Sequence, residues 1–295
     1  MDLGHPILLD GDTCADQLFD DLQKRAAALV ARGTIPKIVT ILVGDDPASS
    51  AYVGRKHDTC ARLGVASEDT RLPYAVDQDT LLGLIHSHNV DPAVDGILVQ
   101  LPLPQHLDPV AISAAIDPRK DVDGLHPVNL GKLMMGTPDI MPCTPAGIVH
   151  LLRHYRIPLA GQRVAIVGRG MLVGRPLAML LSLKGIDAQV SLLHQACDPI
   201  GDTLRSADIV ISAAGQPDLI DASMIRAGAC VVGVGISYDT AGKMVSDIAD
   251  DVVRVAGAVT PRHGSVGALT RAKLMENLIQ IASRRASISP KDAPQ

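Results

Sequence analysis

Apolar residues along this chain follow two patterns, short continuous runs and longer segments in which they recur with helical spacing. The first pattern predicts strands at residues 37–43, 96–100, 163–167, 189–193, 209–213 and 230–234. A further strand, more polar than these, is predicted at residues 66–72. The second pattern predicts helices at residues 14–32, 51–63, 79–89, 110–116, 144–155, 201–206, 222–227 and 270–283. Because strands and helices alternate, we expect parallel strands covered by helices, that is, an α/β protein.

Local signals refine two stretches of this pattern. Ser49 or Ser50 can accept a backbone hydrogen bond as the N-cap of the helix at 51–63, and Gly64 can end that helix. Residues 117–145 show little periodicity and many Gly, Pro and Asp residues. An irregular segment of that length is typical of a functional region or a linker.

A glycine-rich loop follows the predicted strand at 163–167. Gly168, Gly170 and Gly174 have the spacing G-x-G-x-x-x-G, one residue longer than the usual dinucleotide fingerprint, and Pro176 suits a first helical turn. Glycines allow a sharp turn and a close approach to a pyrophosphate, which the positive end of the next helix stabilises. The loop fits either a nucleotide site or an ordinary turn between strand and helix, and its form favours the nucleotide site.

Composition limits the range of functions. The chain has 295 residues, of which 47% are hydrophobic but only 2% are aromatic, and its net charge is −5. This length suits two modest domains or one large one with an aliphatic core. Few aromatic residues and no basic excess argue against a nucleic-acid partner.

The cysteines and the N-terminal sequence indicate a cellular location. The five cysteines are scattered, and neither they nor the ten histidines show a metal-binding spacing. We therefore expect reduced thiols and no metal site. The start of the chain lacks a basic segment followed by an apolar core, and no apolar run reaches the ~18–20 residues of a membrane span. We expect a soluble cytoplasmic protein with no membrane partner.

Tyr52 and Lys56 project from one face of the predicted helix at 51–63, because they are four residues apart. A lysine beside a phenol can form a proton-transfer unit, since burial lowers the pKa of a lysine. The alternative is a solvated helix face, which this spacing alone favours. Short-chain dehydrogenases also use Tyr-x-x-x-Lys, but after the glycine loop, whereas here the pair precedes it.

Polar residues at predicted strand ends suggest ligand contacts. Gln100 ends a buried strand, where open α/β sheets bind ligands. Asp121 or Asp123 could contact a ligand amine or a pterin-like ring edge, or both could simply form turns. His194 stands where many NAD sites place an acid, and the absence of that acid favours NADP over NAD.

Five motifs occur together in one order, and the match to which they belong extends over nearly the whole chain. They are YVGRK (52–56), DGILVQLPLP (95–104), KDVDGLHPVNLGKL (120–133), PCTPAGIV (142–149) and VGRGMLVGRP (167–176). In order and spacing the chain resembles the bifunctional methylenetetrahydrofolate dehydrogenase/cyclohydrolases. For Tyr52, Lys56, Gln100 and Asp123, the resemblance favours a functional role over a purely structural one.

The resemblance implies a fold and an activity. The fold is an N-terminal three-layer α/β catalytic domain (1–143 plus 270–295), a Rossmann-like NAD(P)-binding domain (144–269), and a cleft between them. The activity is NADP-dependent oxidation of 5,10-methylenetetrahydrofolate to the methenyl form, followed by hydrolysis to 10-formyltetrahydrofolate. A homodimer formed through the nucleotide domain is also implied.

The resemblance assigns roles to individual residues as well. Lys56 would serve the hydrolysis, Tyr52 would orient the reacting centre, Gln100 would tune Lys56, and Asp123 would hold the pterin ring. Further substrate contacts are implied for Leu101, Pro102, Gly264 and Val266. Cofactor contacts are implied for Gly168, Arg169, Gly170, Val173, Gly174, Arg175, His194, Ala214, Gly235 and Ile236.

Several positions depart from the family pattern. The family commonly has P-V-P-G-G-V-G-P-M-T where residues 261–270 read PRHGSVGALT. Gly233 replaces a usual Asp, Ser237 a usual Asn, Ser246 a usual Gly, and Gln195 a Ser that many relatives have near the 2′-phosphate. Two alternatives follow: a divergent homologue with a different one-carbon substrate or only one activity, and a non-catalytic nucleotide- or folate-binding homologue.

Overall fold

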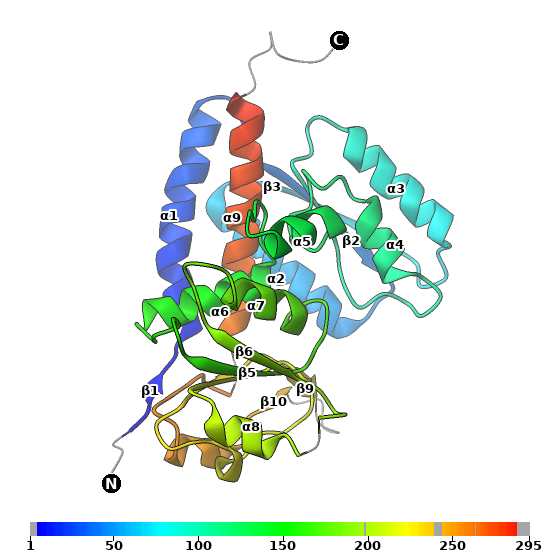
Figure 1. The fold of residues 1–295 in the computed structure, drawn as a ribbon. Coiled ribbons are helices and arrows are strands. Elements are labelled where there is room, and N and C mark those ends of the chain that lie inside the picture. Colours follow the sequence, from blue (N-terminus) through cyan, green and yellow to red (C-terminus); the bar gives the residue numbers. More distant parts are fainter. Residues whose placement is uncertain (1–4, 198, 239–243, 263, 288–295) are drawn as a thin grey trace. The chain divides into compact units, whose positions relative to one another are not determined.

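The computed structural model describes residues 5–197, 199–238, 244–262 and 264–287 of the chain (Figure 1). The chain forms two compact units. The six-strand unit, named after its main sheet, holds the residues up to Asp16 together with 132–138 and 142–270. The three-strand unit holds residues 17–131, 139–141 and 271–287.

A parallel sheet forms the centre of the six-strand unit, in the order β1-β11-β8-β7-β5-β6. Its strands are β1 (Ile7–Leu8), β5 (Arg163–Val167), β6 (Gln189–Leu193), β7 (Ile209–Ser212), β8 (Cys230–Gly233) and β11 (Ala258–Val259). The chain passes from β5 to β6 on one side and then to β7 on the other, so the strand order reverses beside β5. Ligands bind at such a switch point, at the carboxyl ends of the strands.

Helices cover this sheet. They are α6 (Cys143–His154), α7 (Gly174–Leu181), α8 (Gly201–Ser206) and the 3-10 helices η1 (Ala222–Met224) and η2 (Asp250–Arg254). The crossovers through α7 and α8 run in opposite directions, which places these helices on opposite faces because such connections are right-handed. A small antiparallel pair, β9 (Ile236–Tyr238) with β10 (Met244–Ser246), completes the unit.

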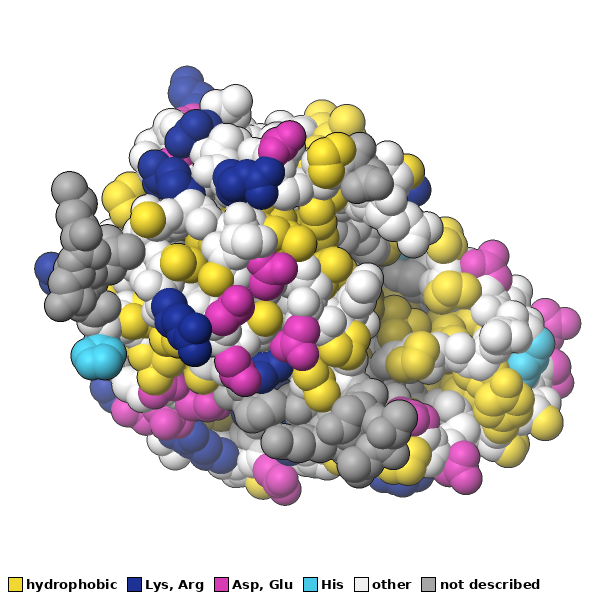
Figure 2. Space-filling view, turned by 90° about the horizontal axis from the view of Figure 1, so that it is seen from below, with side chains coloured by type: hydrophobic (Ala, Val, Ile, Leu, Met, Phe, Trp, Pro, Cys, Tyr) yellow, Lys and Arg dark blue, Asp and Glu magenta, His cyan; other side chains and the backbone are white. Residues whose placement is uncertain are grey.

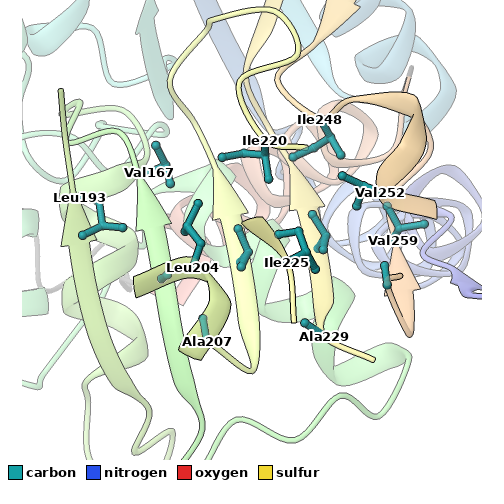
Figure 3. Close-up of a cluster of buried hydrophobic side chains, with 14 residues drawn as sticks. Val167, Leu193, Leu204, Ala207, Ile220, Ile225, Ala229, Ile248, Val252 and Val259 are labelled. Atoms are coloured by element: carbon teal, nitrogen blue, oxygen red, sulfur yellow. The ribbon is translucent and has the colours of Figure 1, made fainter. Parts of the chain in front are cut away.

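Aliphatic side chains form the core on one face of this sheet, as Figure 3 shows. Val167 of β5, Leu193 of β6 and Val259 of β11 belong to one buried cluster with Leu204 of α8 and Val252 of η2. Burial of such side chains stabilises a fold by about 1.5–3 kcal/mol each. The aliphatic core expected from the composition is therefore present.

The three-strand unit contains a parallel sheet in the order β3-β2-β4. Its strands are β2 (Lys37–Val43), β3 (Ala66–Leu72) and β4 (Gly96–Val99). Its helices are α2 (Pro47–Leu63), α3 (Gln78–Val90), α4 (Pro109–Ala115), most of α5 (Pro127–Met134), and most of α1 (Gly11–Ala31) and α9 (Val266–Ser287).

Alternating residues assign helices to each face of this sheet. Ile41 of β2 and Ile97 of β4 cluster with Leu81 of α3 and Ile112 of α4. On the other face, Thr40 Oγ1 lies 2.9 Å from the His57 Nε2 of α2. A Cβ on Gly96 would also lie 2.9 Å from Leu278 of α9. Helices on both faces of the sheet make three layers, as the family resemblance implies.

Helices α1 and α9 run side by side in this unit (Figure 1). The guanidinium of Arg25 on α1 lies 3.7 Å from the carboxylate of Glu276 on α9. The C-terminal helix is therefore part of the three-strand unit from Arg271 on.

The predicted strands are confirmed, each with ends within one residue of the prediction. Four helical predictions need correction. Residues 127–134 form α5 although they lie in the segment expected to be irregular, and α9 begins at Val266 rather than residue 270. The N-cap of α2 is Asp46, not Ser49 or Ser50, because the Asp46 carboxylate accepts the Ser49 N–H at 2.8 Å. Residues 222–227 give only the short turn η1.

Acidic and basic side chains are interspersed on the face that Figure 2 shows. None of the described helices combines the length and apolar character that crossing a bilayer requires.

Candidate active site

Lys56 lies on the buried face of α2. Val53, Cys60 and Leu63 are buried on the same helix, and the lysine side chain is only 4% exposed. The Lys56 Nζ donates a hydrogen bond to Gln100 Oε1 at 3.0 Å and lies 4.6 Å from the centroid of the Tyr52 ring. The solvated-face alternative is therefore wrong for Lys56, whose buried amine lies beside the partly exposed Tyr52.

Gln100 links this lysine to the loop after β4. Its backbone N–H pairs with Ile41 O, and its side-chain Nε2 donates to Leu101 O at 2.6 Å. These two bonds orient the amide so that its oxygen faces Lys56. The Leu101–Pro102 peptide bond is cis, with Leu101 partly buried and Pro102 exposed.

Lys120 and Asp121, the first charged residues after residue 119, form hydrogen bonds within the three-strand unit. Burial lowers the pKa of Lys120, whose Nζ donates to the backbone carbonyls of His88 and Asp91. The buried Asp121 carboxylate accepts hydrogen bonds from the Gly124 N–H, the His126 N–H and the Asn129 side chain. These hydrogen bonds hold the loop at 121–129 in place, so the Asp121 carboxylate has a structural role.

Asp123 is placed differently. It is partly exposed, whereas Asp121 is only 2% exposed, although both aspartates line a small cavity of about 30 Å³ whose wall includes Leu101 of the Gln100 loop. Of the two aspartates between which the sequence left the choice open, Asp123 is thus the better candidate for contact with a ligand.

The glycine loop has the geometry of a close backbone turn. Gly168 has φ +108°, and a Cβ there would lie 2.4 Å from Ala213 O. A Cβ on Gly174 would lie 1.8 Å from Gly168 O, whereas one on Gly170 would meet nothing within 4 Å. The first and third glycines are needed for packing, and the second leaves an open surface.

A pocket of about 380 Å³ opens at this loop, at the carboxyl ends of β5, β6 and β7. It is lined by Val167, Gly168, Arg169, Gly170, His194, Gln195, Ile200, Ala213, Ala214, Gln216 and Leu219. Ligand pockets usually have volumes of ~300–1,000 Å³. None of these described lining residues is acidic, and Arg169 adds a positive charge, so the residues present fit NADP.

Five predicted cofactor residues line this pocket: Gly168, Arg169, Gly170, His194 and Ala214. His194 Nδ1 accepts the Ala196 N–H at 3.2 Å, which leaves Nε2 to carry the proton of the neutral ring. The sequence assigned no cofactor contact to the six other lining residues, which are Val167, Gln195, Ile200, Ala213, Gln216 and Leu219. Of these, Gln195 was noted only as a departure from the family.

The other predicted cofactor residues lie outside the lining. Val173 and Gly174 begin α7, and Arg175 is exposed with its Nη1 3.2 Å from Met171 Sδ. Gly235 lies against the Asp247 carboxylate, where a Cβ would come within 2.0 Å of an oxygen. Ile236 begins β9, and its side chain is outside the described part of the structure.

In the altered loop at 261–270, Ser265 is stabilised by hydrogen bonds of its side chain. Ser265 is fully buried with φ +71°, a conformation that normally favours glycine. Its hydroxyl donates to Leu9 O at 2.9 Å and accepts the Gly11 N–H at 3.1 Å. These bonds offset the backbone strain that replacing a glycine introduces.

The neighbours of Ser265 have distinct surroundings. Arg262 pairs with Asp218 at 2.5 Å and with Asp250 at 2.7 Å, while His263 is outside the described residues. Gly264 is exposed with φ +86°, and Val266 is buried at the start of α9.

Two other departures from the family pattern complement each other. A Cβ on Gly233 would lie 2.9 Å from the side chain of Ile248 and 3.0 Å from Ser246 Oγ. The buried Ser246 therefore occupies space that a side chain at 233 would need. The loss of a side chain at 233 thus makes room for the larger residue at 246.

Two family models match this chain. Residues 9–123 match the catalytic domain of the tetrahydrofolate dehydrogenase/cyclohydrolases, and residues 142–286 match their NAD(P)-binding domain. The two matches together include Lys56, Gln100, Asp123 and the glycine loop.

Solved structures agree over nearly full length. The bifunctional FolD methylenetetrahydrofolate dehydrogenase/cyclohydrolase of Campylobacter jejuni is 38% identical, with a TM-score of 0.91 over 94% of this chain and 99% of that one. The enzyme of Trypanosoma brucei, complexed with NADP cofactor and inhibitor, is 36% identical, with a TM-score of 0.90 over 95% and 98%. A 5,10-methylenetetrahydrofolate dehydrogenase of the silkworm Bombyx mori is 35% identical, with a TM-score of 0.91 over 96% and 99%. The chain therefore belongs to the tetrahydrofolate dehydrogenase/cyclohydrolase family.

Proposed function

We propose that this protein oxidises 5,10-methylenetetrahydrofolate to 5,10-methenyltetrahydrofolate with NADP⁺ and hydrolyses the product to 10-formyltetrahydrofolate. The observation that carries the proposal is the buried Lys56 amine, hydrogen-bonded to Gln100, within the segment that matches the catalytic domain. The nucleotide pocket at the glycine loop supports the redox half.

The oxidation requires positioning more than acid–base chemistry. When bound, NADP⁺ supplies the hydride acceptor. Loss of hydride from the methylene carbon leaves a cation shared between two nitrogens, so no base is needed at this step. The protein contributes by holding the substrate ring and the nicotinamide in contact. Asp123 holds the pterin ring, and Leu101 and Pro102 bound the same site.

The hydrolysis requires a proton acceptor. A water oxygen bonds to the methenyl carbon, and one proton of that water passes to the Lys56 amine, which acts as the general base. The bond between this carbon and N5 then breaks, and the proton of the new hydroxyl moves to N5. The balance is one water consumed and one proton released, with the formyl group left on N10.

The neighbours of Lys56 prepare it for this role. Gln100 Oε1 accepts one N–H of the amine at 3.0 Å and so fixes its direction. The Tyr52 ring lies against the amine, which supports the proposed role of Tyr52 in orienting the reacting centre. The presence of this unit disfavours the alternative of a non-catalytic homologue, because a protein that only binds needs no buried lysine for proton transfer.

The cofactor contacts follow from the pocket. Arg169 and His194 lie where a 2′-phosphate can be recognised, and the backbone from Gly168 to Gly174 receives the pyrophosphate at the start of α7. An acidic residue at the end of β6 would repel the 2′-phosphate, and His194 stands there instead. We therefore propose NADP rather than NAD.

The remaining features are proposed on the family resemblance. They are substrate contacts from Gly264 and Val266, cofactor contacts from Val173, Arg175, Gly235 and Ile236, domain boundaries near residues 143 and 270, a homodimer formed through the nucleotide domain, and a cytoplasmic location. The free state of the five cysteines suits a reducing compartment. Sedimentation of the purified protein would test the dimer.

A spectrophotometric assay tests the function. Purified protein with 5,10-methylenetetrahydrofolate should form NADPH from NADP⁺ much faster than NADH from NAD⁺. Failure to form either reduced nucleotide or methenyl product would reject the folate assignment and leave the alternative of another one-carbon substrate.

A further inference from the structure

Asp247 is a fully buried carboxylate that directly follows β10. Its Oδ2 accepts hydrogen bonds from Ser212 Oγ at 2.9 Å and from the N–H groups of Ala214 and Gly215 at 2.9 and 3.2 Å. Its Oδ1 accepts the Gln216 N–H at 3.0 Å. Four donors thus converge on one carboxylate, and three of them are consecutive backbone amides.

The loop that these bonds hold is a wall of the nucleotide pocket. Ala213, Ala214, Gln216 and Leu219 all line that pocket. Because Asp247 takes the N–H groups of residues 214–216, these amides point away from any ligand. The wall presents side chains and carbonyl groups, and the glycine loop remains the anion-binding part of the site.

Backbone pairing holds the carboxylate itself in place. The Asp218 N–H donates to Ser246 O at 3.0 Å, and the Ile220 N–H donates to Asp247 O at 3.0 Å. The Ala249 N–H returns a bond to Ile220 O at 2.9 Å. The backbone at 246–249 therefore pairs with residues 218–220, while the Asp247 carboxylate binds the N–H groups of residues 214–216.

The loop also contacts the glycine turn. The Ala213 N–H donates to Val167 O at 2.8 Å, and a Cβ on Gly168 would lie 2.4 Å from Ala213 O. At such close packing, a displacement of residues 213–216 must move Gly168 as well. A change at Asp247 would thus reach both sides of the pocket.

This geometry also explains a glycine that the family resemblance assigned to the cofactor. A Cβ on Gly235 would lie 2.0 Å from Asp247 Oδ2, so any side chain there would displace the carboxylate. Gly235 is required at least in part because Asp247 must reach the loop.

We propose that Asp247 is a positioning residue for the NADP site, which acts by fixing the loop at 213–216 rather than by touching the cofactor. The inference rests on the proposed function, since it concerns the same pocket. A change at Asp247 should therefore affect the two activities differently, because the oxidation needs NADP⁺ whereas hydrolysis of 5,10-methenyltetrahydrofolate does not.

The test compares Asp247→Asn with the wild-type protein in two assays. An amide cannot accept at both positions, so at least one backbone N–H loses its partner. We expect the KM for NADP⁺ to rise about 10–100-fold, because small displacements in a pre-organised site have effects of that size. The rate of methenyltetrahydrofolate hydrolysis without NADP⁺ should stay within about twofold of wild type, since cofactor does not enter that step.

Asp208→Asn is the matched control. Asp208 precedes the other end of β7 and pairs with Arg163 and Arg226, away from the residues that line the pocket. It should leave both the KM for NADP⁺ and the hydrolysis rate unchanged. A wild-type protein without dehydrogenase activity would contradict the proposed function, whereas the comparison of variants bears on Asp247 alone.

Two outcomes would overturn the inference: an unchanged KM for NADP⁺, or a parallel loss of both activities in a folded Asp247→Asn protein. If that variant does not fold, Ser212→Ala replaces it, because it removes only the hydroxyl donor at 2.9 Å. A rise of about threefold or more in the KM for NADP⁺ with unchanged hydrolysis would support the inference, and an unchanged KM would contradict it.

Discussion

Among single residues, Lys56 combines two properties that are costly to combine, a titratable amine and burial. Its amine stays buried because Gln100 Oε1 accepts one hydrogen bond and the Tyr52 ring supplies an electron-rich face. Burial disfavours the charged form of a lysine, which suits an amine that must accept a proton from water.

Replacement of this lysine should separate the two reactions. Lys56→Met keeps the length of the side chain but removes the amine. We expect hydrolysis of methenyltetrahydrofolate to fall by about 10²–10⁴-fold, the usual contribution of a positioned proton-transfer group. The NADP⁺-dependent oxidation should fall by less than about tenfold, since it needs no base. Separate assays of the two steps measure both effects.

Lys24→Met is the control for this prediction, because Lys24 is an exposed lysine of α1. It should change neither rate. A Lys56→Met protein that hydrolyses methenyltetrahydrofolate at the wild-type rate would show that the proton goes elsewhere.

Ser265 leads to a stability prediction that compares two substitutions. Both Ser265→Ala and Ser265→Gly remove the hydroxyl that bonds Leu9 O and the Gly11 N–H, a loss of about 1–3 kcal/mol. Glycine also relieves the left-handed conformation, by about 1 kcal/mol. Urea unfolding should rank wild type above Ser265→Gly and Ser265→Gly above Ser265→Ala. The reverse order of the two variants would mean that φ +71° carries no strain here.

The sequence singles out the candidate residues but does not decide between the alternative roles open to them. Spacing placed Tyr52 and Lys56 on one helix face, but whether that face is buried depends on β4 and its Gln100, which are remote in sequence. The same holds for Asp121 and Asp123, which differ in burial, since Asp121 is buried and Asp123 is partly exposed in the folded loop. Asp247 gave no local signal, because its partners at 212–216 lie far upstream in the sequence.

At the scale of elements, α2 carries Tyr52 and Lys56, and its N-terminus is capped by Asp46. The Asp46 side chain accepts the Ser49 N–H, and the hydrogen bond to Ser49 lowers the pKa of Asp46. Removal of an N-cap usually destabilises a protein by about 1 kcal/mol. Asp46→Ala should therefore lower the free energy of unfolding at neutral pH by about that amount in denaturant titrations.

Acidity should remove this difference. Because the folded-state pKa of Asp46 lies below its unfolded value, the cap stabilises above the unfolded pKa and is lost as the pH falls through the folded one. The neighbouring Asp45→Ala is the control, since Asp45 is exposed and does not cap α2. Equal effects of the two substitutions at neutral pH would contradict the role of Asp46.

The elements that the sequence missed are those that tertiary contacts create. Helix α5 contains Pro127 and Gly131 and has little helical propensity of its own. It forms where buried Asn129 donates to the Asp121 carboxylate and to Pro118 O. The short strands β1 and β11 likewise pair only with each other and β8, and runs of two residues carry no periodicity. By contrast, the long apolar strands were predictable because continuous burial is visible in the sequence.

At the scale of the molecule, both units of the α/β fold were predictable, since strands and helices alternate along most of the chain. The pocket in the six-strand unit gives a prediction for stability. A ligand that binds only the folded state at about 100 times its Kd adds about 2.7 kcal/mol. NADP⁺ should therefore raise the Tm by several degrees, and equimolar NAD⁺ should raise it less.

The difference between the two nucleotides should depend on Arg169. Arg169→Gln should lower the gain in Tm with NADP⁺ toward that with NAD⁺, because it removes the positive charge from the pocket wall. Equal gains in Tm for both nucleotides in the wild-type protein would contradict the preference for NADP.

The most direct test follows both products in one reaction of the wild-type protein with 5,10-methylenetetrahydrofolate and NADP⁺. We expect NADPH to form first and 10-formyltetrahydrofolate to follow at a rate above that of methenyltetrahydrofolate hydrolysis in buffer alone. NADPH formation without accelerated 10-formyltetrahydrofolate formation would remove the hydrolytic role of Lys56, and no reaction at all would contradict the proposed function.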